Sequence, residues 1–218
     1  MRPVCGPARL SLILAFSCLV AACGGSGGER ELSSNAMLEA LSEGADEDVA
    51  LGGGERSAQS NFSQDLLDKL KATESSAEAA NLEEEIWEAW LLSGSPTVDM
   101  LMLRGVEATE TADLDLARDM FDRAIRIKPD YAEAWNRRAL LFFNDGHYDE
   151  AISDLEVALT HEPRHFGAWT GLGMIFESIE EPDAALRAYR KVLEIHPHAA
   201  AAKQGEARLI VQVEGRSL

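Results

Sequence analysis

Five histidines are the side chains of this sequence best suited to acid–base or metal chemistry. They are His147, His161, His165, His196 and His198. Imidazole titrates near neutral pH and is a common metal ligand, so the close pairs His161 with His165 and His196 with His198 could contribute to a metal site. All five, however, fall in predicted turns between helices or beside prolines, which is typical of exposed loop residues. We therefore expect no catalytic role, no metal and no cofactor.

Thiol chemistry is confined to the start of the chain. Cys5, Cys18 and Cys23 all precede residue 24, so nothing downstream can form a disulfide, a thiolate zinc site or a cysteine nucleophile. Nucleophile, phosphate-loop and dinucleotide signatures are also absent from the sequence. The run Glu83-Glu84-Glu85 resembles a catalytic carboxylate set only superficially and is interpreted as a solvated helix face. The sequence thus predicts a protein that is not an enzyme.

The chain is strongly acidic. It has 20 Lys and Arg against 38 Asp and Glu, a formal charge of -18 over 218 residues. This charge repels nucleic acid and anionic lipid headgroups. We expect no nucleic-acid partner, and any membrane contact must be hydrophobic or covalent.

An apolar run lies close to the start of the chain. Leu10 to Ala22 contains no charged residue and follows Arg2 and Arg9. The run is too short for a bilayer-spanning helix, which needs about 20 apolar residues, but it suits the core of a secretory signal. Residues 1–22 are therefore predicted to be a signal peptide and the protein to be exported.

The end of this run contains a second motif. Val20-Ala21-Ala22-Cys23 resembles the lipobox of bacterial lipoproteins, which implies cleavage before Cys23 and a lipid anchor on that cysteine. Gly24 resembles the family pattern for sorting to the outer membrane, so the expected location is the periplasmic face of the envelope, anchored to the outer membrane. Ordinary cleavage after Ala22, giving a soluble periplasmic protein, is the alternative.

Residues 23–61 are rich in Gly, Ser, Ala and Glu and poor in large apolar side chains, which predicts a lipidated, disordered linker. As a flexible chain, residues 24–60 would reach roughly 30 to 37 Å. A short helix could form around Asn35 to Leu41, but we expect it to have little to pack against.

The remainder is organised by a 34-residue repeat. Pro129, Pro163 and Pro197 keep this step, and so do several other columns of residues. These columns are Leu101, Trp135 and Trp169; Gly105, Ala139 and Gly173; Ala117, Ala151 and Ala185; Phe121, Leu155 and Tyr189; and Ala124, Ala158 and Val192. Each copy has room for two helices joined by a polar turn, and each proline ends a second helix.

This pattern resembles the tetratricopeptide repeat (TPR). The resemblance covers three copies, 98–131, 132–165 and 166–199, and implies an all-α solenoid of helical hairpins behind the disordered N-terminal tether. Arg138 occupies a column usually given to leucine, so we expect it to pair with a carboxylate or to extend toward solvent. Glu180 replaces the usual turn glycine of the third copy.

Both ends of the array are predicted to be covered, since terminal repeats otherwise expose an apolar face. Residues 62–97 are interpreted as a degenerate leading repeat, with helices over Phe62 to Thr73 and Ala77 to Leu92, because Pro96 lies 33 residues before Pro129. Residues 200–218 are predicted to be a capping helix and tail.

The resemblance also implies a concave groove lined by the first helix of each copy, which in this family holds a partner peptide or helix. The residues at its groove-facing positions are Met102, Val106, Thr109, Asn136, Leu140, Phe143, Asn144, Thr170, Met174 and Glu177. The alternative is that some of these residues are covered by neighbouring helices or by the tether. Asn136 and Asn144 have no cluster of basic residues beside them, so we expect an apolar or basic partner segment rather than a terminal carboxylate. A lipid-anchored adaptor of the envelope is the favoured function, and a holdase-like chaperone for exported proteins is the alternative.

Overall fold

The computed structural model describes residues 34, 36–41, 58–213 and 215, and the predicted signal peptide, Cys23 and most of the predicted linker lie outside this range. The described residues form helices and turns, without any strand. The helices beyond residue 57 are α2 (Ala58–Ala72), α3 (Ser76–Trp90), α4 (Pro96–Glu110), α5 (Leu114–Ile127), α6 (Ala132–Asn144), α7 (Tyr148–His161), α8 (Phe166–Ser178), α9 (Pro182–Ile195) and α10 (Ala200–Val213).

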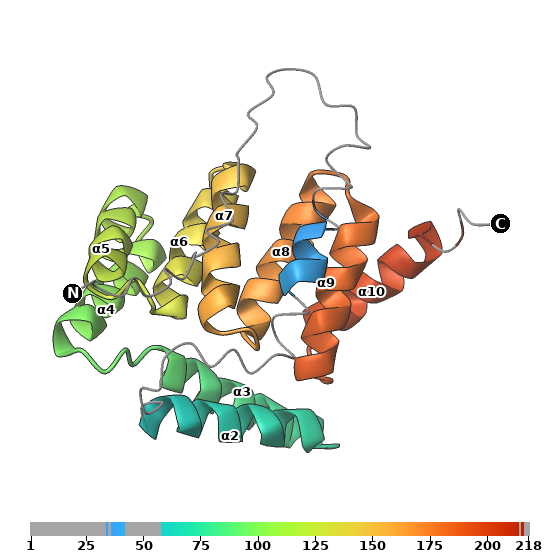
Figure 1. The fold of residues 1–218 in the computed structure, drawn as a ribbon, viewed down its shortest axis with the longest axis horizontal. Helices are drawn as coiled ribbons and strands as arrows, with labels where there is room; N and C mark the ends of the chain where they lie inside the picture. Colours follow the sequence, from blue (N-terminus) through green and yellow to red (C-terminus); the bar gives the residue numbers. More distant parts are fainter. Residues whose placement is uncertain (1–33, 35, 42–57, 214, 216–218) are drawn as a thin grey trace, which may run out of the picture.

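Helices α4 to α9 form three stacked hairpins, one for each predicted copy of the repeat, and α10 packs against the last of them (Figure 1). The predicted all-α hairpin array is therefore confirmed. Pro129, Pro163 and Pro197 each follow the end of a second helix, as the sequence predicts, because proline lacks the N–H that would continue the helical bonding.

Small residues allow the two helices of a hairpin to approach closely. A Cβ atom added to Gly173 would lie 2.6 Å from Cε1 of Tyr189, and one added to Gly105 would collide with the ring of Phe121. Trp169 is 1% exposed, and its indole N–H donates to the carbonyl oxygen of Pro163 at 2.9 Å. Glycine thus complements an aromatic ring in the first and third hairpins, and Ala139 and Leu155 hold the same two columns in the second.

Arg138 pairs with carboxylates, as expected from its position in a leucine column. Its Nε and Nη2 atoms donate to the two oxygens of Asp154, both at 2.7 Å, and Nη1 donates to Asp122 at 2.7 Å. These hydrogen bonds, above all those to Asp154, raise the pKa of the guanidinium above its ordinary value. The charge is therefore held in a network that links α5, α6 and α7.

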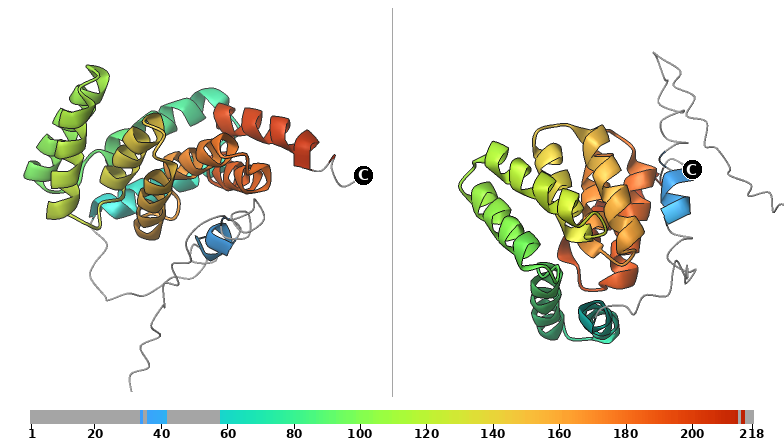
Figure 2. Two further views of the ribbon diagram at one scale, coloured as in Figure 1. Left: turned by 90° about the horizontal axis from the view of Figure 1, so that it is seen from above. Right: turned by 60° about the vertical axis from the view of Figure 1, so that its left-hand side comes forward.

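The α2–α3 hairpin does not stack on α4 as a leading repeat would, so that prediction is wrong. It runs along one edge of the array, beneath the turns that join successive repeats (Figures 1 and 2). Gln64 of α2 donates to Glu162 at 2.8 Å, and Arg164 pairs with Asp68 at 2.8 Å. Tyr131 donates from its hydroxyl to the carbonyl oxygen of Trp90 at 2.6 Å. The hairpin therefore fastens the inter-repeat turns together.

Residues 36–41 are helical, and they contact the folded body on the side of α9 (Figure 1). Leu38 is 4% exposed and belongs to the main apolar core, with Met37 and Leu41 packed against it. The expectation that a helix here would have little to pack against is wrong. Predicted disorder of 23–61 does not hold for these residues, nor for 58–61, which belong to α2.

No helix within the described part of the chain is long and apolar enough to cross a membrane.

Candidate functional site

The concave side of the array contains a groove with a cavity of about 640 Å³. Its walls come from α6, α8 and α10, and α3 closes one end. The residues that line it include Glu83, Trp87, Asn136, Arg137, Leu140, Phe143, Gly167, Thr170, Gly171, Met174 and His196.

The walls of the groove are mainly apolar. Leu140 is 43% exposed and Met174 is 41% exposed, which are high values for large apolar side chains in the middle of a repeat. Phe143 is half-buried and joins this cavity to a second one of about 470 Å³ that also touches Met174. A continuous apolar surface of this kind normally marks a binding site.

Two glycines of α8 let side chains of other helices approach it closely at the groove. Gly167 and Gly171 lie one turn apart on the groove face of the helix. A Cβ atom at Gly171 would lie 3.1 Å from Leu155, and one at Gly167 would collide with the indole of Trp87. Gly167 therefore admits Trp87 to the end of the groove, and Gly171 admits Leu155 to its floor.

Trp87 and Glu83 are groove residues that lie outside the three repeats. Trp87 packs edge-on against Phe166, with ring centroids 5.2 Å apart, and the guanidinium of Arg137 lies 5.7 Å from an indole ring centroid. Glu83 is 42% exposed and lies 3.3 Å from Nε2 of His196. The hairpin thus gives the groove an aromatic and acidic end that a bare three-repeat array lacks.

A buried polar network supports this end of the groove. Glu133 is 1% exposed and His165 is fully buried, and their Oε2 and Nε2 atoms are 3.0 Å apart. Because Nδ1 of His165 accepts the N–H of Ala168, Nε2 carries the proton and donates to Glu133. Arg137 and Asn136 also donate to Glu133, at 2.5 and 2.9 Å. Burial acts to raise the pKa of Glu133, but the hydrogen bond from His165 and the charge of Arg137 hold it below its ordinary value.

Two histidines that we expected in exposed loops are buried. His165 is 0% exposed and caps the N-terminus of α8, and His196 is 3% exposed beneath the α2–α3 hairpin. Burial lowers the pKa of His196, although the hydrogen bond with Glu83 opposes that shift. Both rings are covered by the α2–α3 hairpin, which was predicted to be a leading repeat. Within the described residues, no three His, Cys, Asp or Glu side chains are grouped so as to hold a metal ion.

The structure brings together six of the ten predicted groove residues around the two cavities. Asn136, Leu140, Phe143, Thr170 and Met174 line the main cavity, and Glu177 lines the adjoining one, where Arg208 pairs with it at 2.9 Å. Thr170 donates its hydroxyl to the carbonyl oxygen of Phe166, so this oxygen atom is already engaged.

The first repeat does not contribute as predicted. Met102 is 0% exposed and belongs to the core of that repeat, so it is not a groove residue. Val106 packs against the same core, and Thr109 donates to the carbonyl oxygen of Gly105. Asn144 is exposed at the end of α6, outside both cavities. The residues that line the two cavities therefore come from the second and third repeats, α10 and, at one end, α3.

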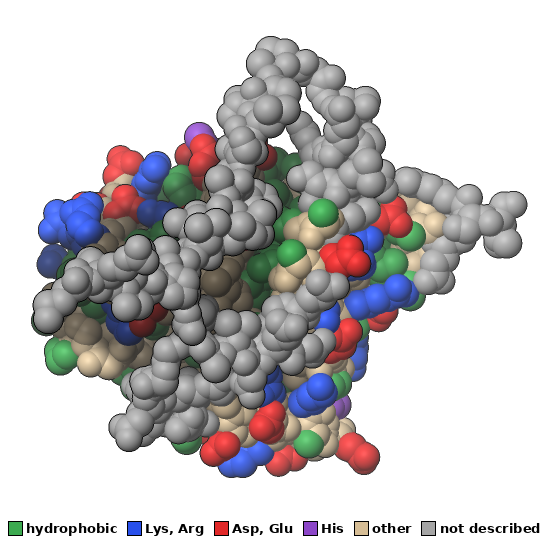
Figure 3. Space-filling model, viewed as in Figure 1, with side chains coloured by type: hydrophobic (Ala, Val, Ile, Leu, Met, Phe, Trp, Pro, Cys, Tyr) green, Lys and Arg blue, Asp and Glu red, His purple; other side chains and the backbone are tan. Residues whose placement is uncertain are grey.

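Two basic residues lie at the groove, although the sequence predicted no cluster of basic residues beside Asn136 and Asn144. Arg137 lines the main cavity beside Asn136, and Arg208 lines the adjoining cavity. Each is paired with a glutamate, Glu133 and Glu177 respectively. On the face shown in Figure 3, cationic and anionic side chains are interspersed over the α2–α3 hairpin. Within residues 58–90 the acidic side chains nevertheless outnumber the basic ones, which are Lys69 and Lys71.

The comparisons with known proteins agree with this geometry. Residues 102–160 and 137–200 match the sequence profile of the tetratricopeptide repeat. A TPR repeat-containing protein of Rhizobium etli is 40% identical over 132 residues, which are 61% of this chain and 65% of that protein. The match thus spans a little less than two thirds of the relative's length.

Solved structures show the same fold. The TPR domain of Sgt2 from Aspergillus fumigatus aligns with a TM-score of 0.53 and 25% identity, over 56% of this chain and 83% of that one. The first TPR of Spaghetti (RPAP3), solved with the HSP90 peptide SRMEEVD, aligns with a TM-score of 0.53 and 19% identity, over 55% and 95% of the two chains. Residues 102–200 are therefore similar to the tetratricopeptide repeat in sequence, and the structure has the same stacked helical hairpins, with a further hairpin along the edge of the array.

Proposed function

We propose that this chain is a non-enzymatic adaptor that holds a segment of a partner protein in its concave groove. The observation that carries the proposal is the apolar cavity of about 640 Å³ in which Leu140 and Met174 remain 43% and 41% exposed. Large apolar side chains on a concave surface gain free energy when a partner removes them from water. Helices in the repeats hold these side chains, so little ordering is needed on binding.

The charges around the groove favour a partner segment with apolar anchors and a basic residue. Arg137 and Arg208 are both paired with glutamates, and the lowered pKa of His196 favours its neutral form. Glu83 is the exposed charge left at the end of the cavity, next to the indole of Trp87. An acidic tail, such as the HSP90 peptide held by the RPAP3 domain, would meet no unpaired Lys or Arg among the cavity-lining residues.

A binding role also fits the state of the polar groups. The Glu133–His165 pair has the residue types of an acid–base dyad, but the two side chains are 1% and 0% exposed and lie beneath Trp90. No substrate can reach atoms so enclosed. Their positions favour a structural role for the pair.

We further propose that residues 1–22 direct export and that Cys23 carries a lipid anchor on the periplasmic face of the outer membrane. The lipobox-like Val20-Ala21-Ala22-Cys23 supports this part of the proposal. Mass spectrometry of the protein purified from membranes should find an acylated cysteine as its first residue. Cys23→Ser should move the protein to the soluble periplasmic fraction; an unacylated native protein in that fraction would support ordinary cleavage instead.

Site-specific photo-crosslinking tests the groove. A benzoylphenylalanine residue at position 174 should give one discrete protein adduct in cells that express the full chain. The matched control is position 116, since Leu116 is 38% exposed on α5 and lies outside both cavities. Equal adduct patterns from the two positions would contradict the proposal. Many unrelated adducts at position 174, together with suppressed aggregation of a test client such as citrate synthase, would indicate a holdase instead.

A further inference from the structure

The face of the array opposite the groove is occupied by part of the chain's own N-terminal region. Ser34 is 8% exposed and Leu38 is 4% exposed, and residues 36–41 form a short helix. Met37 and Leu41, one residue before and three residues after Leu38, also pack on the main core. We refer to residues 34 and 36–41 as the amino-terminal segment.

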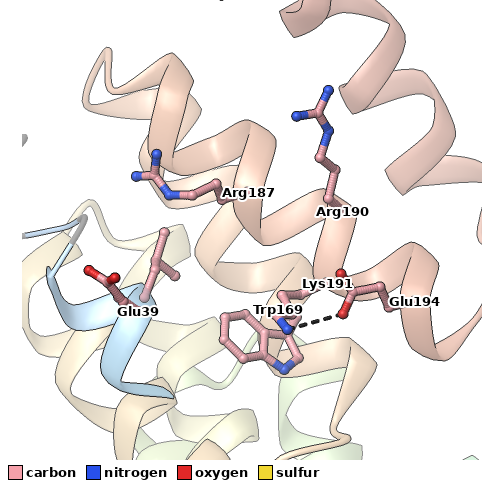
Figure 4. Close-up of a pocket in the computed structure, with 7 residues that line it drawn as sticks. Glu39, Trp169, Arg187, Arg190, Lys191 and Glu194 are labelled. Atoms are coloured by element: carbon pink, nitrogen blue, oxygen red, sulfur yellow. Dashed lines mark hydrogen bonds and ion pairs between the residues drawn. The ribbon is translucent and has the colours of Figure 1, made fainter. Parts of the chain in front are cut away.

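The amino-terminal segment and α9 enclose a cavity of about 430 Å³ (Figure 4). Leu38 and Glu39 line one side, while Trp169, Arg187, Arg190, Lys191 and Glu194 line the other. Nη2 of Arg187 is buried and has no hydrogen-bond partner within the described chain. The surface that receives the segment is thus an aromatic edge surrounded by three cationic residues of α9, in a protein whose net charge is -18.

This surface and the groove lie on opposite sides of α8. Gly167, Gly171 and Met174 line the groove, whereas Trp169 lines the cavity beneath Leu38. At 100° per residue, Met174 is rotated from Trp169 by about 140° around the helix axis, and the two glycines by about 160° in either direction. The segment therefore leaves the groove free.

We propose that the α9 face is a docking site for the amino-terminal segment and that the segment binds it reversibly. If Cys23 carries the lipid anchor proposed above, this intramolecular contact orients the groove away from the anchor. Leu38 inserts beside Trp169, and Glu39 lies among the cations of α9. Ser34 then lies on the side of α8 opposite the groove.

Reversibility follows from the size of the contact. Most of the stability of a helix in a folded protein comes from packing of its apolar face, and for the described residues this packing comes from Met37, Leu38 and Leu41. Burial of Leu38, with partial burial of Met37 and Leu41, must offset the ordering of the whole segment, and an open cavity of about 430 Å³ beside Leu38 limits the area of the contact. The segment should therefore exchange between docked and free states while the repeats stay folded.

Hydrogen-exchange mass spectrometry on the full chain tests this inference. Leu38→Asp should release the segment, and the amides of residues 36–41 should exchange about tenfold faster than in the native protein. Ala40→Asp is the matched control, because it places the same charge on the exposed side of the same helix and should leave exchange unchanged. Arg187→Glu, which sets a carboxylate in the cavity that Glu39 lines, should release the segment from the α9 side.

Native exchange rates indistinguishable from those of Leu38→Asp would overturn the proposal. The proposal would also be overturned if the amides of residues 36–41 lost their protection from exchange on dilution and sedimentation showed a dimer. The occupant of the docking site would then be the segment of a second copy. Circular dichroism should show that the repeats remain folded in all three variants. Crosslinking from position 174 should be unaffected by Leu38→Asp, so the docking site and the proposed partner groove can fail separately.

Discussion

The indole of Trp90 stacks on the imidazole of His165, with ring centroids 4.0 Å apart and planes inclined by 13°. This contact joins α3 to the turn between the second and third repeats. The imidazole in turn donates to Glu133 of α6 and caps α8. One buried ring thus connects the edge hairpin to two repeats, and the end of the groove depends on it.

Replacing His165 should therefore destabilise the whole domain. We expect His165→Ala to lower the free energy of unfolding by about 3 kcal/mol, because it leaves Glu133 buried without one of its donors and removes the stacked ring. Urea unfolding followed by circular dichroism measures the change. His161→Ala, at an exposed position at the end of α7, should cost less than about 0.5 kcal/mol. Equal effects of the two substitutions would exclude the proposed role of His165.

The hairpin turns contain a second set of testable positions. Ala112 and Glu180 have φ values of 59° and 62°, at the places equivalent to Gly146, whose φ is 76°. A side chain costs roughly 1 kcal/mol in this left-handed conformation. Ala112→Gly and Glu180→Gly should each raise the free energy of unfolding by about that amount, and Gly146→Ala should lower it similarly.

Ser153→Gly is the control for this series. Ser153 lies exposed within α7, where the backbone is right-handed and glycine should destabilise by about 0.5 to 1 kcal/mol. A stabilising effect of glycine at position 153, or a destabilising effect at positions 112 and 180, would contradict the assignment of strain to the turns.

The ion-pair network of Arg138 should behave as a buried charge cluster. Arg138→Leu leaves Asp154, whose side chain is 6% exposed, without its bidentate partner, and should cost about 3 to 5 kcal/mol. The double variant Arg138→Leu with Asp154→Leu should recover most of that loss, since it buries no unpaired charge. Thermal or urea unfolding of the two variants compares them directly; a double variant as unstable as the single one would show that packing, not charge, dominates at this site.

The buried His196 predicts a dependence of stability on pH. Its pKa is lowered from the ordinary 6.5 in the folded state, mainly by burial, so below pH 6.5 the unfolded chain binds a proton that the folded chain does not. The contribution of His196 is therefore complete above pH 6.5 and decreases as the pH falls toward its folded-state pKa. His196→Gln should flatten the difference in unfolding free energy between pH 7.5 and pH 5.5. His161→Gln should leave that difference as it is in the native protein.

Much of the fold can be read from the sequence because the 34-residue columns encode contacts within and between adjacent helices. The columns place Gly173 and Tyr189 on the two helices of one hairpin, and a carboxylate partner was one of the two outcomes expected for Arg138. The edge hairpin could not be read in this way. Pro96 suggested another repeat by its spacing, but it is the first residue of α4, whereas Pro129 follows the end of α5.

A signal against a leading repeat was present in α4. In the third copy, Leu172 and Ile175 are buried on the side of the preceding repeat. Arg104 and Glu107 hold the same two positions in the first copy, 68 residues earlier. Polar side chains in these columns are typical of a terminal face exposed to solvent. Likewise Tyr131 and His165, 34 residues apart, are both large, ring-bearing and buried, and both contact Trp90. The partners of such rings lie on a distant segment, so periodicity alone cannot identify them.

The most direct test of the central claim is the affinity of the purified chain for the partner recovered by crosslinking from position 174. Leu140→Asp should weaken that affinity by at least about tenfold, because the substitution places a charge at the centre of an apolar contact. Leu116→Asp, at an exposed position of α5 that lines neither cavity, should leave the affinity within about twofold. Equal affinities of the native, Leu140→Asp and Leu116→Asp proteins would contradict the account.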